Sequence, residues 1–149
     1  MLRISSLQVE HLPEGCVTDK RHPVFSWFAE SDRNDNAVSA AILQAGDWEK
    51  HTKKQSGIRY RGEDLAPMTE YPVKLTVTDA FGETAEAETS FETGRMGLPF
   101  EASWITDGEY VFKEKKVSPV PMYFRREADL TKPADEVAKA RLYVTALGR

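Results

Sequence analysis

Apolar and polar residues alternate most regularly over Tyr71–Ala80, whose sequence is YPVKLTVTDA. Alternate positions separate into an apolar set, Val73, Leu75 and Val77, and a polar set, Lys74, Thr76 and Thr78. A period of two predicts a β-strand with one buried face and one face toward water. Because this strand is the best-defined element of the chain, its neighbours are placed from it.

The residues on either side of this strand indicate a β-sandwich. Tyr71 follows a turn that contains Pro67, which is typical of a tyrosine corner, where the hydroxyl binds backbone a few residues upstream. Asp79–Gly82 has the composition of a turn, and Ala85–Phe91 is the expected returning strand. An ordinary hairpin in another all-β fold is the alternative.

Four earlier segments have the composition of short strands. They are Leu2–Val9 with apolar residues Ile4, Leu7 and Val9, the segment that begins at Pro23, Val38–Ala45, and Ile58 with Tyr60. Phe25 and Trp27 are expected to form a buried aromatic pair. Val38–Ala45 also suits a short helix, but the turn-rich segments around it favour a strand. His11–Asp19 and Trp48–Gly57 are expected to be loops.

The sequence changes character at Gly94. About seven strands before it are typical of a fibronectin type III or immunoglobulin-like β-sandwich. The next residues lack alternation but are too apolar for disorder, which indicates a packed linker. Met122–Leu130 and Ala140–Leu147 then have the composition of two strands. Two strands do not make a stable domain, so we expect a complete sandwich over residues 1–94 and a linker with the incomplete start of a second β-sandwich over 95–149.

Composition narrows the class of protein. The chain has 149 residues, is 40% hydrophobic and has a net charge of −4, so no general attraction to nucleic acid or an anionic membrane is expected. Cys16 is the single cysteine, which excludes a disulfide within the chain. The sequence has no apolar run of membrane-helix length and no signal-peptide core at its start. A cytoplasmic location is therefore expected.

Paired acids are the first candidates for chemistry, because glycoside hydrolysis needs two carboxyl groups across the sugar. Asp107 with Glu109, and Glu63 with Asp64, are such pairs, but their turn-like surroundings favour solvated turn residues. The sequence contains no G-x-S-x-G motif, phosphate loop or dinucleotide fingerprint. The sequence therefore predicts no catalytic residue and no cofactor.

Metal binding is also not predicted. His11, Cys16 and His22 have metal-binding side chains, but their spacing matches no common zinc pattern. Asp32, Asn34 and Asn36 begin like a calcium loop, but the positions that require Gly and Glu hold Ala37 and Leu43.

Aromatic rings offer a different kind of site, because sugars stack on them. The aromatic residues not assigned to the sandwich core are Trp48, Tyr60, Trp104 and Tyr110. Trp48, in an expected polar loop, is the candidate for sugar stacking, although a loop Trp more often packs beneath the loop. Trp104 is assigned to packing between domains.

The order of several segments resembles the N-terminal region of bacterial α-L-rhamnosidases of the large multidomain type. The matching segments are HPVFSW at 22–27, EYPVKLTVTDAFGE at 70–83, SFETG at 90–94, ASWIT at 102–106, FRREADL at 124–130 and ARLYVTALGR at 140–149. The resemblance implies a fibronectin type III-like domain that ends at the FETG segment, followed by a second β-sandwich. It also implies that the catalytic acids lie in an (α/α) barrel beyond Arg149, so none maps onto this chain.

The expected function is that of a non-catalytic N-terminal accessory part of such a glycoside hydrolase, whose parent enzyme would remove terminal α-L-rhamnose from glycosides. A free-standing fibronectin type III-like module that binds carbohydrate or protein is the alternative. Downstream domains of the parent enzyme are the expected partners. Since strands without neighbours pair readily, a homodimer through Met122–Arg149 is also expected.

Overall fold

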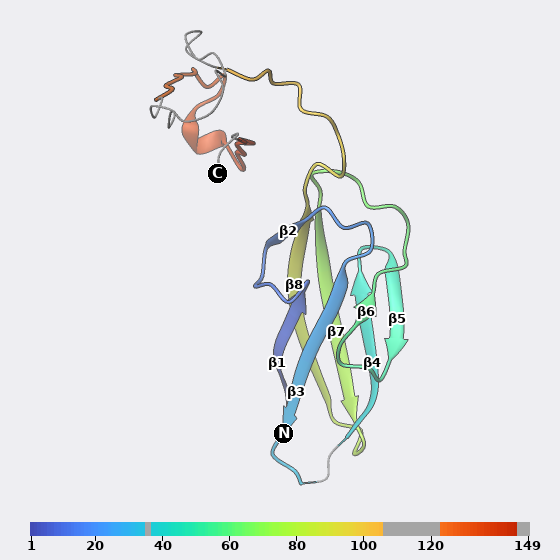
Figure 1. Ribbon diagram of the computed structural model, residues 1–149. Helices are drawn as coiled ribbons and strands as arrows, with labels where there is room; N and C mark the ends of the chain where they lie inside the picture. Colours follow the sequence, from blue (N-terminus) through green and yellow to red (C-terminus); the bar gives the residue numbers. More distant parts are fainter. Residues whose placement is uncertain (35–36, 106–122, 146–149) are drawn as a thin grey trace, which may run out of the picture. The chain divides into compact units, whose positions relative to one another are not determined.

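The structure is a computed structural model that describes residues 1–34, 37–105 and 123–145. Its elements are β1 (Leu2–Val9), β2 (Cys16–Thr18), β3 (Val24–Ser31), β4 (Val38–Ala45), β5 (Trp48–Thr52), β6 (Ile58–Arg59), β7 (Glu70–Asp79), β8 (Thr84–Thr93) and the 3₁₀ helix η1 (Ala134–Glu136). The strands form one sheet in the order β1-β3-β6 and another in the order β2-β8-β7-β4-β5 (Figure 1). The predicted all-β sandwich is confirmed.

β7 lies in the middle of the larger sheet and supplies the centre of the core. It pairs antiparallel with β8 on one side and with β4 on the other. Val73, Leu75 and Val77 are buried, as the alternation predicted. They pack in one cluster with Phe25 and Phe91, whose rings meet edge to face with centroids 6.1 Å apart. The two sheets are therefore held together by the face of β7 that the sequence indicates most clearly.

The predicted tyrosine corner is present at the start of β7. The Ala66 N–H donates a hydrogen bond of 2.7 Å to the Tyr71 hydroxyl, and the Tyr71 ring stacks on Phe91 with centroids 5.4 Å apart. Nearby, the buried Thr93 hydroxyl donates to the Ala66 carbonyl at 2.6 Å and accepts from the Thr69 N–H at 2.9 Å. The segment before β7 is thus bonded to both long strands of the sheet.

A β-bulge explains the irregular apolar pattern of β1. The register with β3 shifts between Ile4 and Ser6, so one extra residue is accommodated there. Ile4 lies two residues after buried Leu2, whereas Leu7 lies two residues before buried Val9, and all four pack on the core. The bulge keeps both halves of the strand facing inward.

Two strands lie in segments that were expected to be loops. β5 pairs with β4 through the two-residue turn Gly46–Asp47, and Gly46 has φ +56°, which suits the first position of a type II′ hairpin turn. β5 is an edge strand with charged, exposed residues, which is how edges avoid aggregation. β2 runs parallel to the end of β8 and, with only three residues, gives no periodic signal.

The chain divides into two compact units, Met1–Ala102 and Ser103–Arg149. The predicted strands Met122–Leu130 and Ala140–Leu147 are not formed in their described residues, 123–130 and 140–145; Met122 and residues 146–147 lie outside the described part. Without further strands to complete a sheet, two such segments are marginal. The division at Gly94 stays a prediction.

The turn after β1 holds two residues in an unusual backbone conformation. Glu10 and His11 have φ values of 55° and 59°, which residues other than glycine rarely adopt. The Glu10 carboxylate accepts the Val24 N–H at 2.7 Å and forms an ion pair with Lys20. The His11 imidazole lies 3.2 Å from the hydroxyl of Ser26. Side-chain bonds to β3 therefore hold the turn in its strained form.

Burial of Glu10 acts to raise its pKa, but the hydrogen bonds from Lys20 and the Val24 N–H outweigh burial and hold the pKa below its ordinary value. A carboxylate whose pKa is lowered in the folded state stabilises the fold at pH values above the pKa that it has in the unfolded chain. That contribution is lost as the pH falls through the folded-state pKa. The stability of this turn is therefore expected to depend on pH.

Replacing Glu10 by Gln should lower the free energy of unfolding by about 1 kcal/mol near pH 7, because the charged partner of Lys20 is lost. The difference from wild type should shrink as the pH approaches about 3. Urea unfolding at both pH values measures it, with Glu14→Gln, an exposed change in the same loop, as the control. A difference that is equal at both pH values would contradict this role of the Glu10 charge.

Replacing Tyr71 by Phe removes the acceptor of the Ala66 N–H and keeps the ring on Phe91. We expect a loss of about 1–2 kcal/mol in the free energy of unfolding, measured by urea denaturation. Tyr123→Phe is the matched control, because Tyr123 is 97% exposed, and it should leave stability unchanged. Equal stability of Tyr71→Phe and wild type would show that the hydrogen bond of the corner does not stabilise the fold.

Candidate functional site

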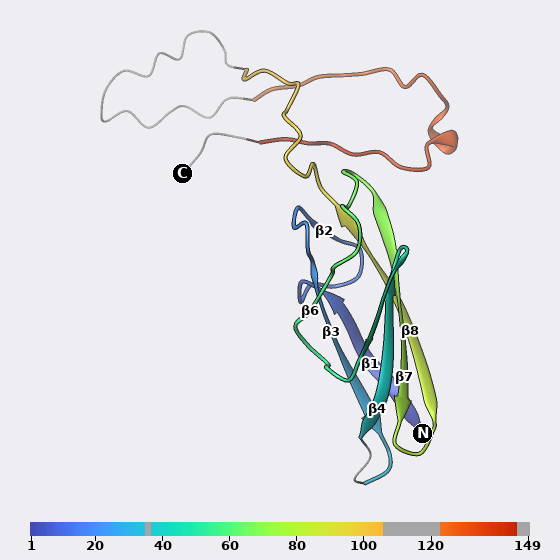
Figure 2. The ribbon, with the colours of Figure 1, turned by 90° about the vertical axis from the view of Figure 1, so that its right-hand side faces the viewer.

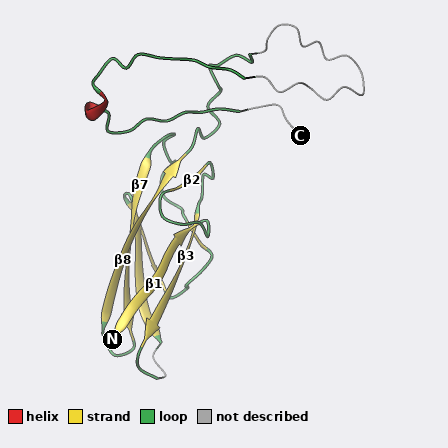
Figure 3. Ribbon diagram, turned by 90° about the vertical axis from the view of Figure 1, so that its left-hand side faces the viewer, coloured by secondary structure: helices red, strands yellow, loops and turns green. Residues whose placement is uncertain are grey.

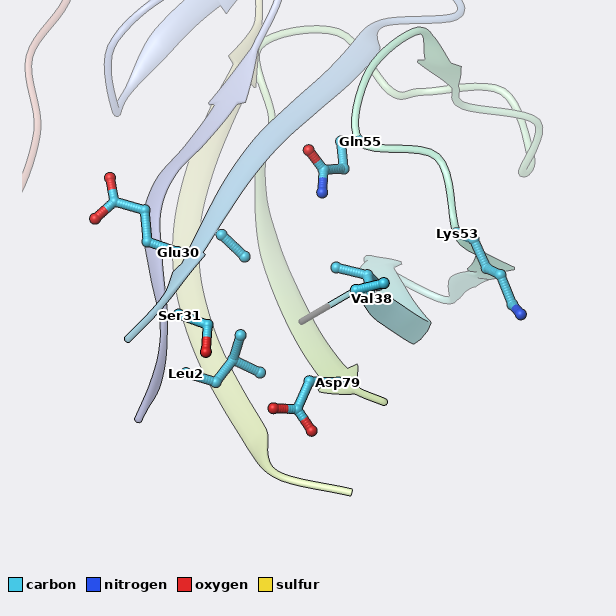
Figure 4. A pocket seen from close by; sticks show the side chains of 9 residues that line it. Leu2, Glu30, Ser31, Val38, Lys53, Gln55 and Asp79 are labelled. Carbon is cyan, nitrogen blue, oxygen red and sulfur yellow. The ribbon is translucent and has the colours of Figure 1, made fainter. Parts of the chain in front are cut away.

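A pocket of about 290 Å³ opens at one end of the sandwich. Its walls come from β1, β3, β4, the end of β7 and the segment that follows β5 (Figure 4). Its polar side chains are Glu30, Ser31, Lys53, Gln55 and Asp79. These residues were not predicted as a site, because they come from three separate segments and share no sequence motif.

The carboxylates of the pocket already have structural partners. Glu30 accepts a hydrogen bond of 3.0 Å from the Arg3 guanidinium on the neighbouring strand. Asp79, which is 2% exposed, accepts the N–H groups of Phe81 and Glu83 at 2.9 and 2.8 Å. These bonds close the turn between β7 and β8. A glycosidase needs one carboxyl group free to donate a proton and another free to attack or to activate water. Because the Glu30 and Asp79 carboxylates are both engaged, their role here is to hold the fold.

Trp48, the predicted sugar-stacking residue, begins β5 and is half-buried. Its ring stacks on Phe25 with centroids 5.9 Å apart and meets Tyr60 at 5.1 Å. A Cβ atom at Gly62 would lie 2.8 Å from the Cβ of Trp48 and 2.4 Å from the Tyr60 hydroxyl, so the chain can pass there only as glycine. Through these contacts Trp48 packs against the core, and sugar binding by it stays a prediction.

Burial of Tyr60 raises its pKa, and nearby Tyr71, Glu63 and Asp47 act in the same direction. Trp104, the other described aromatic considered for a site, is 65% exposed. Tyr110 lies outside the described residues. The aromatic candidates therefore do not form one platform in the part of the chain that is described.

The other candidate groups also remain separate. Glu63 and Asp64 are exposed, and Asp107 and Glu109 lie outside the described residues. Within residues 1–34, 37–105 and 123–145, no three His, Cys, Asp or Glu side chains converge on a point where a metal would bind.

The individual metal-binding side chains have other contacts. The Cys16 thiol lies 3.6 Å from the Val9 carbonyl, and burial raises the pKa of that thiol. The Asp32 carboxylate pairs with the amino group of Met1, which lowers the pKa of Asp32. Asn36 of the incomplete calcium pattern lies outside the described residues.

The outer face of β7 is polar and crossed by side-chain bonds. Lys74 forms an ion pair of 2.9 Å with Glu86 on β8, and the Thr76 hydroxyl donates to the same carboxylate at 3.2 Å. The ion pair raises the pKa of Lys74 and lowers that of Glu86. This face is therefore an ordered polar surface of the sandwich.

Two packed sheets, the antiparallel β7–β8 hairpin and the tyrosine corner define an immunoglobulin-like β-sandwich domain. The sequence model of one family, described as the Rha78A-like, N-terminal immunoglobulin domain, matches residues 4–97. The chain belongs to this family. A comparison with curated protein sequences finds no match.

Solved structures of three α-L-rhamnosidases contain a similar sandwich. The enzyme from Streptomyces avermitilis, complexed with L-rhamnose, has a TM-score of 0.58 and 27% identity over 64% of this chain and 11% of its own. The enzyme from Dictyoglumus thermophilum has a TM-score of 0.56 and 22% identity over 62% of this chain and 12% of its own. The native enzyme from Aspergillus terreus has a TM-score of 0.53 and 16% identity over 63% of this chain and 12% of its own.

This chain thus spans 11% to 12% of the length of the rhamnosidases that it matches. At 22% and 16% identity the last two likenesses concern the fold alone. Among the described residues, no helix has the length and the apolar composition needed to cross a membrane. The matches therefore identify the family of the sandwich domain, which agrees with the resemblance to the N-terminal region of α-L-rhamnosidases noted in the sequence.

Replacing Trp48 by Ala should lower the free energy of unfolding by about 2–3 kcal/mol, because its ring fills space against Phe25 and Tyr60. Urea unfolding measures the loss. Trp104→Ala is the matched control and should change stability by less than about 0.5 kcal/mol, since Trp104 is largely exposed. Equal effects of the two changes would mean that Trp48 is not part of the core.

Proposed function

We propose that this chain is the non-catalytic N-terminal accessory part of an α-L-rhamnosidase-like glycoside hydrolase. Its role is mechanical: the sandwich holds neighbouring domains of the parent enzyme in place. The parent enzyme would hydrolyse terminal α-L-rhamnose from glycosides, with its catalytic acids in domains outside this chain.

The observation that carries the proposal is the match of residues 4–97 to an immunoglobulin domain that stands at the N-terminus of Rha78A-like proteins. The similar sandwiches belong to α-L-rhamnosidases many times longer than this chain. The engaged carboxylates of Glu30 and Asp79 support a structural role as well. A catalytic pair would keep its carboxyl groups available to substrate.

A second candidate function is a module that binds carbohydrate or protein by itself. The pocket favours it, since Ser31 and Gln55 are polar residues among those that line it (Figure 4). Sugar hydroxyl groups bind such mixtures of donors and acceptors. The two candidates differ in whether the isolated chain binds a free sugar.

Incubation of the purified chain with p-nitrophenyl α-L-rhamnoside tests the absence of catalysis. We expect no release of p-nitrophenol above the rate without protein, because the two carboxylates that line the pocket, Glu30 and Asp79, are held by Arg3 and by the turn after β7. An intact α-L-rhamnosidase serves as the positive control. Turnover by the chain that disappears in a Glu30→Gln or Asp79→Asn variant would contradict the accessory role.

Titration with L-rhamnose separates the two candidate functions. The accessory role predicts that the amide signals of Lys53 and Gln55, and the indole signal of Trp48, do not move in the NMR spectrum. A saturable shift of those signals, lost in a Lys53→Ala variant, would favour the binding module. Lys50→Ala, an exposed change on β5, is the control.

A further inference from the structure

β8 is paired along only part of its outer side. Its neighbours in the sheet are β7 and β2, and β2 covers only Phe91–Thr93 (Figure 1). Within the described part of the chain, no strand pairs with Thr84–Glu88 on the side away from β7, although β1 of the smaller sheet packs close to β8. Unpaired backbone groups along a strand are a template for another strand.

Two hydrogen bonds at the ends of the β7–β8 ladder decide which backbone groups of β8 face β7. Asp79 N donates to Glu83 O at 3.0 Å, and Thr93 N donates to Thr69 O at 2.9 Å. Successive residues of an antiparallel strand direct their backbone groups to opposite sides. Odd-numbered residues of β8 therefore bond to β7. The backbone groups that point outward belong to the even-numbered residues Thr84, Glu86 and Glu88.

Two further hydrogen bonds agree with this assignment. Gly15 N donates to the carbonyl of Ser90 at 3.1 Å, and Gly94 N donates to the carbonyl of Thr18 at 3.0 Å. Both bonds lie on the outer side of β8. Ser90 is an even-numbered residue of the strand, and Gly94 is the even-numbered residue directly after its end. The end of the edge near Ser90 already has backbone partners, whereas the outward backbone groups of Thr84–Glu88 have the same geometry and no described strand that pairs with them.

The side chains along this edge specify the chemistry of a partner. Glu86 and Glu88 are exposed on the outer face of the sheet, whereas Ala85 and Ala87 are half-buried on the inner face. Opposite charges on neighbouring strands attract, and small inward residues leave room for apolar side chains beside them. A strand that adds here would carry basic residues outward and apolar residues inward.

A second copy of the same strand would be a poor partner. In the registers that place the outward residues of two β8 strands beside each other, glutamates meet glutamates, Thr84 or Ser90. Like charges directly opposite each other on paired strands are destabilising. The charge pattern therefore favours a basic partner over self-pairing.

We propose that the outer edge of β8, Thr84–Glu88, is a strand-addition site for an extended peptide segment that alternates Lys or Arg with apolar residues. The backbone groups of Thr84, Glu86 and Glu88 bond to the added strand, as in other strand-addition complexes. The Glu88 carboxylate selects its basic face, beside Glu86, which already pairs with Lys74. This interaction is independent of the accessory function proposed above.

Titration of the full chain with an end-capped peptide of alternating lysine and valine tests the site by NMR-detected hydrogen exchange. The amides of Glu86 and Glu88 should become protected at least about tenfold when the peptide is bound. The amides of Ala85 and Ala87 should not change, because they already bond to β7. A peptide of the same composition, with its lysines and valines in separate blocks, is the control and should give no protection.

Variants separate the contributions of charge and backbone. Glu86→Lys with Glu88→Lys should weaken binding of the lysine–valine peptide at least about tenfold and create binding of a glutamate–valine peptide. Glu49→Lys, on β5 at the opposite edge of the sheet, should leave the affinity within about twofold. Glu88→Pro removes an outward N–H that β7 does not use, so it should weaken binding more than Glu88→Gln does.

Three outcomes would overturn the proposal. The first is an absence of protection at Glu86 and Glu88 with the alternating peptide in large excess. The second is equal protection by the block peptide. The third is concentration-dependent protection of these amides in the chain alone, which would assign the edge to a second copy. Thermal unfolding of each variant verifies that the sandwich is folded.

Discussion

The inward face of β7 is the constraint on which the rest of the sandwich depends. Val73, Leu75 and Val77 reach the core only in one register, because a slip by one residue would turn Lys74, Thr76 and Thr78 inward. The hydrogen bond from the Ala66 N–H to the Tyr71 hydroxyl holds the start of the strand at that register. β8 and β4 then pair on its two sides, so their own inward residues, Phe91 and Leu43 among them, meet the smaller sheet.

Many polar side chains of the sandwich close its turns. Asp79 bonds the backbone between β7 and β8, Thr93 holds the segment before β7, and Glu10 holds the turn after β1. Figure 2 and Figure 3 show that these turns lie at the ends of the long strands. The carboxylates of Asp79 and Glu10 are thus engaged with backbone N–H groups of these turns and of β3. Binding capacity remains in the backbone at the edge of β8.

Much of the sandwich follows from patterns in the sequence. Alternation predicted β7, the aromatic pair Phe25 and Trp27 is buried, and the position of Tyr71 after Pro67 indicated the corner. Val38–Ala45 is a strand, as its turn-rich surroundings favoured over its helical propensity. Each of these features depends on residues that are close together in the sequence, so one short segment is enough to predict it.

The features that the sequence did not predict depend on contacts between distant segments. β5 is stabilised by pairing with β4, and its charged residues hide its strand character. Trp48 therefore begins a strand and packs, half-buried, against the core of the sandwich, and does not lie in a polar loop. The pocket joins Glu30 with Lys53 and Asp79, and the open edge of β8 becomes visible only once β2 is known to cover three residues of it.

Native-state hydrogen exchange of the isolated chain tests most directly whether β7 is the centre of the fold. All amides from Val73 to Val77 bond to β8 or β4, so they should exchange only through global unfolding. Their exchange free energies should equal one another and the free energy of unfolding from denaturant. Amides of the edge strands β2 and β5 should exchange with lower free energies. Faster exchange in β7 than in these edge strands would contradict the account.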